Sequence, residues 1–419
     1  MRITNLTSAS REGHTELAFW AVAFAFTTVM AFTTLPTPLW SLYARHDHFS
    51  SLTVTLVFAA YAVAVALSLF LAGHLSDSYG RRRVLAPALA LNLIAGAVFV
   101  AWPELPGLLI ARVVSGLGIG AVTATATAWL TELRSASRPN ESGGRSQAIA
   151  VAANLGGLGL GGLIAGVLAQ WAGSPLSLPF VVLLAALLLA EIGLLAAPET
   201  RVEEAPRPRY RPQRVSVPPR ARGRFVAASL GAMIAFALFG LVTSLAPSFL
   251  EGSLHRPSHA LAGAVSFAMF ASAALAQTLS SSRTTQQLLA MAVPALLAGV
   301  GLLTLALWLA TPSLPIFVAG DVLAGVGAGL MFKGAIGTVS EISLPNHRAE
   351  ALAGLFLAAY LGLAGPVIGL GALTQITSAR VSLLVFSGLL ALGIFAAAPT
   401  LLGGRGRGPR ISTQPQPTS

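Results

Sequence analysis

The stretch Gly73–Arg83, with the sequence GHLSDSYGRRR, interrupts a chain that is otherwise strongly apolar. It follows the apolar run 53–72 and comes just before the apolar run 84–102. Each run is long enough to cross the roughly 30 Å hydrocarbon core of a bilayer as a helix. The stretch is therefore expected to be a short loop between two membrane-spanning helices. A plain turn would not need its Asp, Gly and Arg residues, so these residues indicate a further role.

The composition of the whole chain fits this interpretation. Of 419 residues, 55% are hydrophobic and only 10% are charged, whereas a soluble domain carries about 25% charged residues. Strict apolar/polar alternation of the kind found in membrane β-barrels is absent from the sequence. The chain has no cysteine, which excludes disulfides and cysteine-based metal or redox sites. We predict an all-α membrane protein without metal or cofactor.

Apolar runs and their polar breaks divide the chain into membrane-spanning helices. The first 16 residues are polar, and the run after them is too long for the core of a signal peptide, so we expect a retained first helix. The pattern predicts 12 spans near 17–43, 53–75, 84–102, 106–131, 146–170, 178–197, 224–250, 259–279, 288–310, 314–340, 348–375 and 379–402.

The distribution of arginine orients these spans. The N-terminal tail, the breaks after every second span and the C-terminal tail hold 21 arginines, and the opposite side holds 3, Arg45, Arg256 and Arg380. Cytoplasmic loops of membrane proteins carry the excess of Lys and Arg. We therefore expect both termini and the Pro- and Arg-rich segment 201–223 to be cytoplasmic, in a cell membrane. Because the charges lie between spans, the net charge of +11 does not indicate nucleic-acid binding.

The two halves of the chain are related by an internal repeat. Gly116, Gly118 and Gly120 recur 209 residues later as Gly325, Gly327 and Gly329, and Glu132 recurs as Glu341. The segment 33–40 parallels 243–250 at an offset of 210. Internal repeats are common in secondary transporters. The predicted organisation is an N-terminal tail 1–16, a six-helix bundle 17–200, a linker 201–223, a second six-helix bundle 224–402 and a C-terminal tail 403–419.

The opening stretch resembles the signature loop of the major facilitator superfamily, Gly-x-Leu-x-Asp-x-x-Gly-Arg-Arg/Lys. Gly73, Leu75, Asp77, Gly80, Arg81 and Arg82 meet every fixed position of this pattern, between spans 2 and 3. Arg112 and Gly116 are similar to an Arg-x-x-x-Gly motif of the fourth helix. The run Gly157–Gly162 approaches the Gly-Pro-x-x-Gly-Gly motif of antiporter branches, with Leu158 where that motif has Pro.

The resemblance implies two pseudo-symmetric six-helix bundles that rock about a central site for a small molecule. It implies a monomer in the lipid bilayer, with a proton as the coupling ion. The sequence contains neither the His-Glu-x-x-His spacing of an intramembrane metalloenzyme nor a Gly-rich phosphate loop. We therefore expect a transporter rather than an enzyme, although the sequence leaves a non-transporting membrane receptor open.

The resemblance also suggests a cytoplasmic gate. Asp77 would lie against a helix N-terminus of the second half, where negative charge is favoured, and Arg81 could reach Glu132. The proposed gate residues are Gly73, Asp77, Gly80, Arg81, Arg82 and Glu132. The equivalent loop of the second half has Gln286 in place of Asp77, so the gate is expected to be one-sided.

Four charged residues inside spans are candidates for transport or proton coupling, because such residues usually face the protein interior or a wet cavity. The repeat places Arg112 and Asp321 at equal depth, so the two could pair across the axis and close the outer side of a cavity, or both could extend to the outer headgroups. Lys333, the single lysine, could meet an anionic substrate or extend toward the cytoplasm. Glu191 could carry a proton or make a structural hydrogen bond.

The first helix of each group of three is expected to line the cavity, and Pro36 and Pro38 should kink span 1 near its outer end. The candidate lining residues are Thr33, Thr34, Thr37, Trp40, Thr123, Thr125, Thr127, Thr243 and Ser244. This lining is mostly apolar with scattered hydroxyls, which suits an amphipathic organic molecule. We expect proton-coupled efflux of such a compound. The alternative is proton-coupled uptake of a small metabolite, with an anion as one option.

Overall fold

The computed structural model describes residues 2–73, 75–138, 141, 143–201, 215, 217–344 and 347–403, with side chains from residue 13 onward. Over these ranges the regular structure is entirely helical, with no strand. It contains 12 helical segments long and apolar enough to cross a membrane, from Gly13–His46 to Ala379–Leu402. The all-α fold and the 12 predicted spans are therefore confirmed. Most of the predicted linker 201–223 and of the tail 403–419 lies outside the described residues.

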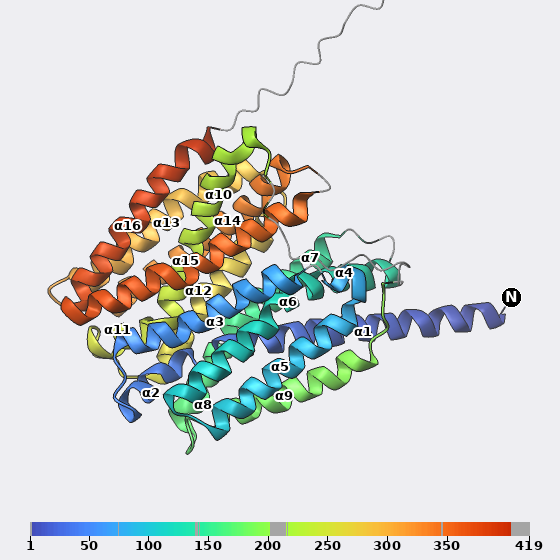
Figure 1. Ribbon diagram of the computed structural model, residues 1–419, viewed down its shortest axis with the longest axis horizontal. Coiled ribbons are helices and arrows are strands. Elements are labelled where there is room, and N and C mark those ends of the chain that lie inside the picture. The colour runs from blue at the N-terminus through green and yellow to red at the C-terminus, as the bar shows by residue number, and fades with distance from the viewer. Residues whose placement is uncertain are drawn as a thin grey trace, which may run out of the picture.

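Helices of the first half run from α1 to α9 (Figure 1). They are α1 (Arg2–Thr34), η1 (Thr37–Leu39), α2 (Trp40–His46), α3 (Ser51–Ala72), α4 (Leu75–Tyr79), α5 (Arg81–Ala101), α6 (Leu105–Ser137), α7 (Gly144–Val151), η2 (Ala152–Gly156), α8 (Gly157–Trp171) and α9 (Leu178–Ala196). η1 is a 3₁₀-helix and η2 is one turn of π-helix.

Helices of the second half run from α10 to α16. They are η3 (Pro219–Ala221), α10 (Arg222–Ser244), α11 (Ala246–Gly252), α12 (His259–Leu279), α13 (Thr285–Trp308), α14 (Leu314–Ile342), α15 (Arg348–Ile376) and α16 (Ala379–Leu402). Local signals in the sequence explain several of the helix starts. Thr284 and Gln287 form a reciprocal capping box at α13, and the Ser378 hydroxyl accepts a bond from the Val381 N–H at α16.

The two halves form two bundles that meet at one end and diverge at the other (Figure 1). We call the end that carries α2 and α11 the sealed end, and the end that carries α4 and α7 the loop end. Across the boundary between halves, α8 packs on α12 and α3 packs on α15. The first span breaks near the sealed end at Pro36 and Pro38, where α1 gives way to η1 and α2. This break follows the expected effect of proline on a helix.

Packing inside the two halves follows the internal repeat. A Cβ atom added to Gly116 would lie 2.6 Å from the Tyr61 carbonyl oxygen on α3, and one added to Gly325 would lie 2.4 Å from the Met269 carbonyl oxygen on α12. Only a residue without a side chain permits such close approach of helix backbones. The repeated glycines therefore hold α6 against α3 and α14 against α12 in the same way.

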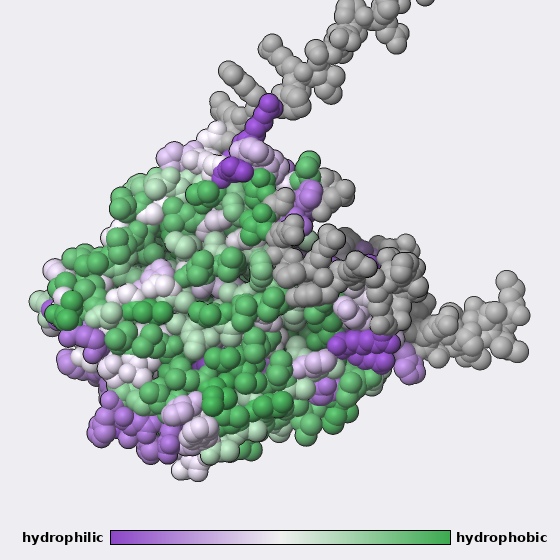
Figure 2. Space-filling model, viewed as in Figure 1, coloured by the Kyte–Doolittle hydropathy of each residue, from purple (hydrophilic) through white to green (hydrophobic). Residues whose placement is uncertain are grey.

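The outer surface is suited to lipid. Figure 2 shows hydrophobic residues over most of the visible face, with hydrophilic residues gathered toward its edges. Large apolar side chains such as Val63, Leu189, Leu392 and Phe395 are more than half exposed. A soluble monomer rarely exposes so much contiguous apolar surface, so these side chains indicate helices that face a bilayer.

Candidate functional site

A cavity of about 760 Å³ lies between the two halves. It reaches from Thr33 and Thr243, toward the sealed end, to exposed residues at the loop end that include Thr131, Gly144 and Ser281. Both halves contribute walls, from α1, α3, α6, α7, η2 and α8 on one side and from α10, α12, α14 and α15 on the other. The cavity is therefore accessible from the loop end in this conformation.

Polar contacts between the halves close the other end. The Trp40 indole N–H donates to the Thr243 carbonyl at 3.2 Å, and Arg45 pairs with Glu251 at 3.1 Å. The side-chain oxygen of Gln170 accepts from the His259 backbone N–H at 2.9 Å. Each of these bonds joins an element of the first half to one of the second, so they would have to break for the sealed end to open.

Glycine contacts bring α8 and α12 together at the same end. A Cβ atom added to Gly263 would lie 2.3 Å from the Gly162 carbonyl oxygen, and one added to Gly166 would lie 2.4 Å from the His259 carbonyl oxygen. Gly162 and Gly166 of span 5 are thus used for contact between halves, whereas Gly157 and Gly161 meet α1 of their own half. Both uses agree with the role of small residues in membrane helix packing.

The predicted gate residues gather at the loop end of the first half. Arg81 donates to Glu132 and to Asp77, each at 2.8 Å, while the Arg81 and Arg82 backbone N–H groups donate to the Glu199 carboxylate at 2.9 and 3.0 Å. Glu199 therefore satisfies free N–H groups in the first turn of α5. The structure does not bring Asp77 to the second half; its side chain is 63% exposed, as the divergence of the bundles at this end requires.

Two glycines frame this cluster. Gly80 has a φ of +101°, a conformation that glycine adopts without strain, and the Glu199 carboxylate occupies the space where a Cβ would stand. Gly73 caps the C-terminal end of α3, and its backbone N–H donates to the Leu69 carbonyl. In the second half the equivalent surroundings differ: Gln286 donates to the Leu402 carbonyl at 3.4 Å, and Glu341 pairs with Arg224 at 3.3 Å.

The predicted pair of Arg112 and Asp321 is not formed in this conformation, and both side chains are buried rather than extended to the outer headgroups. Arg112 is buried in the first half, where it donates to the Thr33 carbonyl at 2.9 Å and its guanidinium lies 5.1 Å from the Trp40 ring and 5.2 Å from the Tyr61 ring. Asp321 is fully buried on α14, and neither of its carboxyl oxygens has a partner among the described residues. Equal depth in the repeat did not bring the two together, because aromatic rings and a free carbonyl of its own half engage the arginine.

The other two charged candidates lie in different places. Lys333 lines the cavity, and its ammonium group donates to the Gln277 carbonyl at 2.5 Å. Glu191 lies on α9, which packs against α1, α5 and α8 and does not line the cavity. One of its oxygens is buried without a partner among the described residues.

The structure places five of the predicted lining residues in the cavity wall, namely Thr33, Thr34, Thr123, Thr127 and Thr243. The other four lie outside the cavity lining in this conformation. Thr37 and Trp40 follow the turn at Pro36 and pack into the sealed end. Ser244 is buried at the end of α10, and Thr125 is buried on α6.

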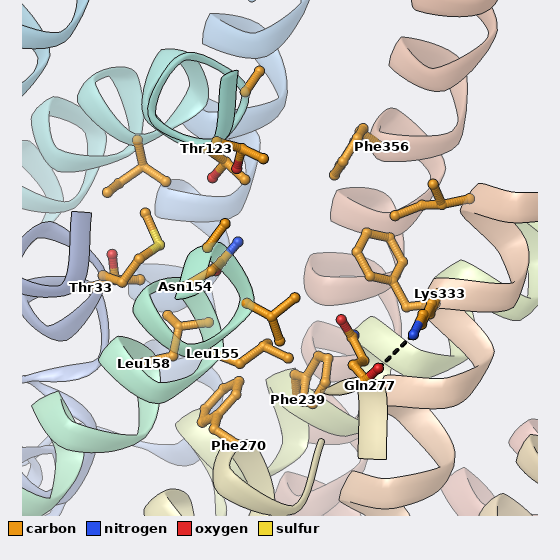
Figure 3. A pocket seen from close by; sticks show the side chains of 18 of the residues that line it. Thr33, Thr123, Asn154, Leu155, Leu158, Phe239, Phe270, Gln277, Lys333 and Phe356 are labelled. Carbon is orange, nitrogen blue, oxygen red and sulfur yellow. Dashed lines mark hydrogen bonds between the residues drawn. The ribbon is translucent and has the colours of Figure 1, made fainter. Parts of the chain in front are cut away.

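Several lining residues were missed by sequence reasoning (Figure 3). Asn154 reaches the cavity from η2, whose π-helical turn is of a kind often found at functional sites. Gln277 lies opposite on α12. A polar amide inside an apolar span was the signal that could have identified both. The aromatic lining was also missed: Phe58, Tyr61, Phe236, Phe239, Phe270, Phe332, Phe356 and Tyr360.

Two related helix bundles around a cavity that is open at one end define a membrane carrier. The model of the Major Facilitator Superfamily matches residues 21–309, and the chain belongs to that family of transporters. A stretch of 91 residues is 32% identical to the arabinose-proton symporter of Bacillus subtilis (strain 168). This match covers 22% of the chain and 19% of that protein, so the chain spans about a fifth of the relative's length.

Solved structures share the fold. A point mutant of the nucleoside transporter NupG has a TM-score of 0.71 at 13% identity, with 92% of this chain and 99% of that one covered. A bacterial homolog of the human lysosomal transporter Spinster, inward-facing and unoccupied, has a TM-score of 0.65 at 18% identity and coverage of 93% and 98%. The human organic anion transporter MFSD10 (TETRAN) has a TM-score of 0.63 at 18% identity and coverage of 91% and 99%.

Proposed function

We propose that this transporter exports a small amphipathic organic compound by alternating access, driven by a proton gradient. The observation that carries the proposal is the cavity between the halves, which is open at the loop end and closed at the sealed end by bonds from one half to the other. Breaking those bonds while closing the loop end would present the same cavity to the opposite side of the membrane. The two rocking units are the bundles 17–200 and 224–402.

The arginine distribution supports a cytoplasmic position for the loop end, with 21 arginines on its side and 3 on the other. Both termini and the linker 201–223 are then cytoplasmic, and the conformation described here faces inward. In the outward-facing state the cluster of Asp77, Arg81 and Glu132 approaches the second half and closes the cytoplasmic side. Gly73, Gly80 and Arg82 hold the loop in shape for that contact.

The cavity lining supports an amphipathic substrate. Aromatic and aliphatic side chains form most of the walls, with isolated threonine hydroxyls and the amides of Asn154 and Gln277 between them. A ligand site of this kind favours molecules with a large apolar surface and a few polar groups.

Similarity to a proton symporter over 91 residues supports coupling to protons. Within the described residues, Asp321 has two unpartnered carboxyl oxygens and Glu191 has one. Acids buried in membrane helices often take part in proton transfer, so these two are our candidates for the coupled proton. Arg112 has a different role in this proposal, because it fixes the outer end of α1 by its bond to Thr33.

Uptake of a small anionic metabolite is the second candidate function. Lys333 in the cavity wall favours an anion, and the symporter relative favours a substrate that moves together with the proton. Export and uptake use the same cavity and differ in the direction of the coupled flux.

A substrate screen in inverted membrane vesicles tests both candidate functions, export and uptake. Under export, an acid-inside pH gradient drives accumulation of the substrate, and collapse of the gradient abolishes it. Under uptake, the same gradient drives the substrate out of preloaded vesicles. Flux that ignores the gradient would remove proton coupling, and with it the roles given to Asp321 and Glu191. Absence of flux for every compound from correctly folded protein would contradict transport itself.

A further inference from the structure

Two residues with a formal charge line the cavity among the residues that the structure describes, Glu132 and Lys333. Glu132 lies near the loop end, and its carboxylate is already bound by Arg81 at 2.8 Å and by the Thr200 hydroxyl at 2.5 Å. Its negative charge is therefore matched by an arginine of its own half. The cavity is left with one positive charge that no acidic side chain of its described lining balances.

Lys333 holds that charge within the wall formed by α14. Its ammonium group donates one bond, at 2.5 Å, to the Gln277 carbonyl near the C-terminal end of α12 (Figure 3). A lysine ammonium has three N–H groups, and the structure gives an acceptor for one of them. The negative end of a helix favours a nearby cation, so the bond to Gln277 holds the ammonium at the wall without neutralising it.

Aromatic rings line the same cavity as this charge and can hold an apolar body. Phe332 directly precedes Lys333 in the chain, and its ring centroid lies 4.9 Å from that of Phe236 and 5.6 Å from that of Phe356. Phe239 and Phe270 stack with their ring centroids 5.0 Å apart and line the same cavity (Figure 3). Ring faces and edges of this kind accept flat apolar groups by stacked or edge-to-face contacts.

We propose that Lys333 is the anion-binding group of the site and that the substrate is an amphipathic organic monoanion. Its carboxylate or sulfonate binds the Lys333 ammonium, and its apolar body lies among the phenylalanine rings. This inference rests on the proposed function, since it assumes that the cavity is the transport site. A second negative charge on the ligand would meet no free cation in the described lining, and a cationic ligand would oppose Lys333. A cavity of about 760 Å³ admits a drug-sized molecule of this class.

Matched naphthalene probes test the charge preference with the purified full chain in lipid nanodiscs. The probes are 2-naphthoate, its neutral isostere 2-naphthamide and the cation 2-naphthylmethylammonium, with affinity measured by calorimetry. A charge-assisted hydrogen bond should favour the naphthoate over the amide by about 10- to 100-fold. Equal affinities in the wild-type protein, tighter binding of the amide or cation, or no detectable binding of naphthoate would each overturn the proposal.

Variants of Lys333 separate binding from a purely structural bond to α12. K333Q should bring the affinities for naphthoate and naphthamide within about threefold of each other, while K333R should keep the anion preference. If Lys333 only stabilises the end of α12, K333Q lowers the melting temperature but leaves the preference intact, which contradicts the proposal. If K333Q does not fold, the comparison of the three probes on the wild-type protein decides alone.

Vesicle flux distinguishes failure of this inference from failure of the proposed function. Gradient-driven transport of a neutral or cationic compound that survives K333Q would leave transport standing and remove the anion site. Naphthoate binding that depends on Lys333, without flux of any compound, would keep the anion site and contradict transport.

Discussion

The crossing of α8 and α12 at the sealed end offers a test of the conformational change. In Gly263→Ala the new methyl group would stand 2.3 Å from the Gly162 carbonyl oxygen and 3.2 Å from the Leu163 Cα. Both are backbone atoms of the other half, so no side-chain rotation relieves the clash. Overpacking of this kind costs about 1–3 kcal/mol. Because the contact joins the two halves, the cost falls on the conformation that is closed at this end.

The population of that conformation should fall accordingly. A cost of 1–3 kcal/mol changes the ratio of two states by about 5- to 150-fold. The chain has no cysteine, so spin labels at Ser174→Cys and Arg256→Cys, exposed positions in different halves, can be placed without background. Double electron–electron resonance should then show a longer distance between the labels when Gly263→Ala is added than in the same labelled protein with Gly263.

A second glycine supplies the control. Gly388 lies on α16, where an added Cβ has no atom within 4 Å. Gly388→Ala makes the same chemical change and should leave the distance distribution unaltered. If Gly263→Ala left it unaltered as well, with the protein folded, the backbone contact would not hold the halves together and this reasoning would fail.

Three further predictions concern single contacts. Gly80→Ala places a methyl group at φ +101° and 2.6 Å from a Glu199 oxygen, and should lower the free energy of unfolding by about 1–3 kcal/mol in denaturant titrations; unchanged stability would refute the role given to this turn. Trp40→Phe removes a hydrogen bond between the halves worth about 1 kcal/mol. The population of molecules that are open at the sealed end, measured with the same spin labels, should therefore rise roughly fivefold. An unchanged population would contradict the role given to this bond. The hydrogen bond from Arg134 lowers the pKa of Glu141 below 4.5. At neutral pH the wild-type protein should therefore have a higher melting temperature than Glu141→Gln, and this difference should disappear as the pH falls through the lowered pKa. A difference in melting temperature that does not depend on pH would contradict the assignment.

Much of the fold could be predicted from the sequence because lipid imposes a simple requirement. Each span must be long and apolar enough to cross the bilayer, and the pattern of runs and breaks therefore locates the helices to within several residues. The repeated glycines at Gly116 and Gly325 also carried spatial information, because each marks a position where two backbones touch. The pairing of Arg81 with Glu132 followed from their places at neighbouring helix ends.

The direction in which intramembrane side chains point was harder to predict. The repeat gives Arg112 and Asp321 the same depth, but depth does not determine which neighbour a side chain faces. Arg112 turns to the Thr33 carbonyl and nearby rings instead. Asn154 depends on a π-helical turn, which adds a residue to the turn and rotates the following face of the helix. Nothing in the local sequence marks that turn.

Locking the sealed end tests the alternating-access account most directly. A Cβ atom added to Gly371 on α15 would lie 3.1 Å from the Thr55 Cβ on α3. This is a few tenths of an ångström below the separation of about 3.5–4.5 Å found in disulfides, so a small shift of the two helices permits the bond. In the double variant Thr55→Cys, Gly371→Cys, oxidation should stop flux of the compound found in the vesicle screen, and reduction should restore it. Each single-cysteine variant should be insensitive to oxidant. Continued flux with the disulfide fully formed would contradict transport by opening of this end.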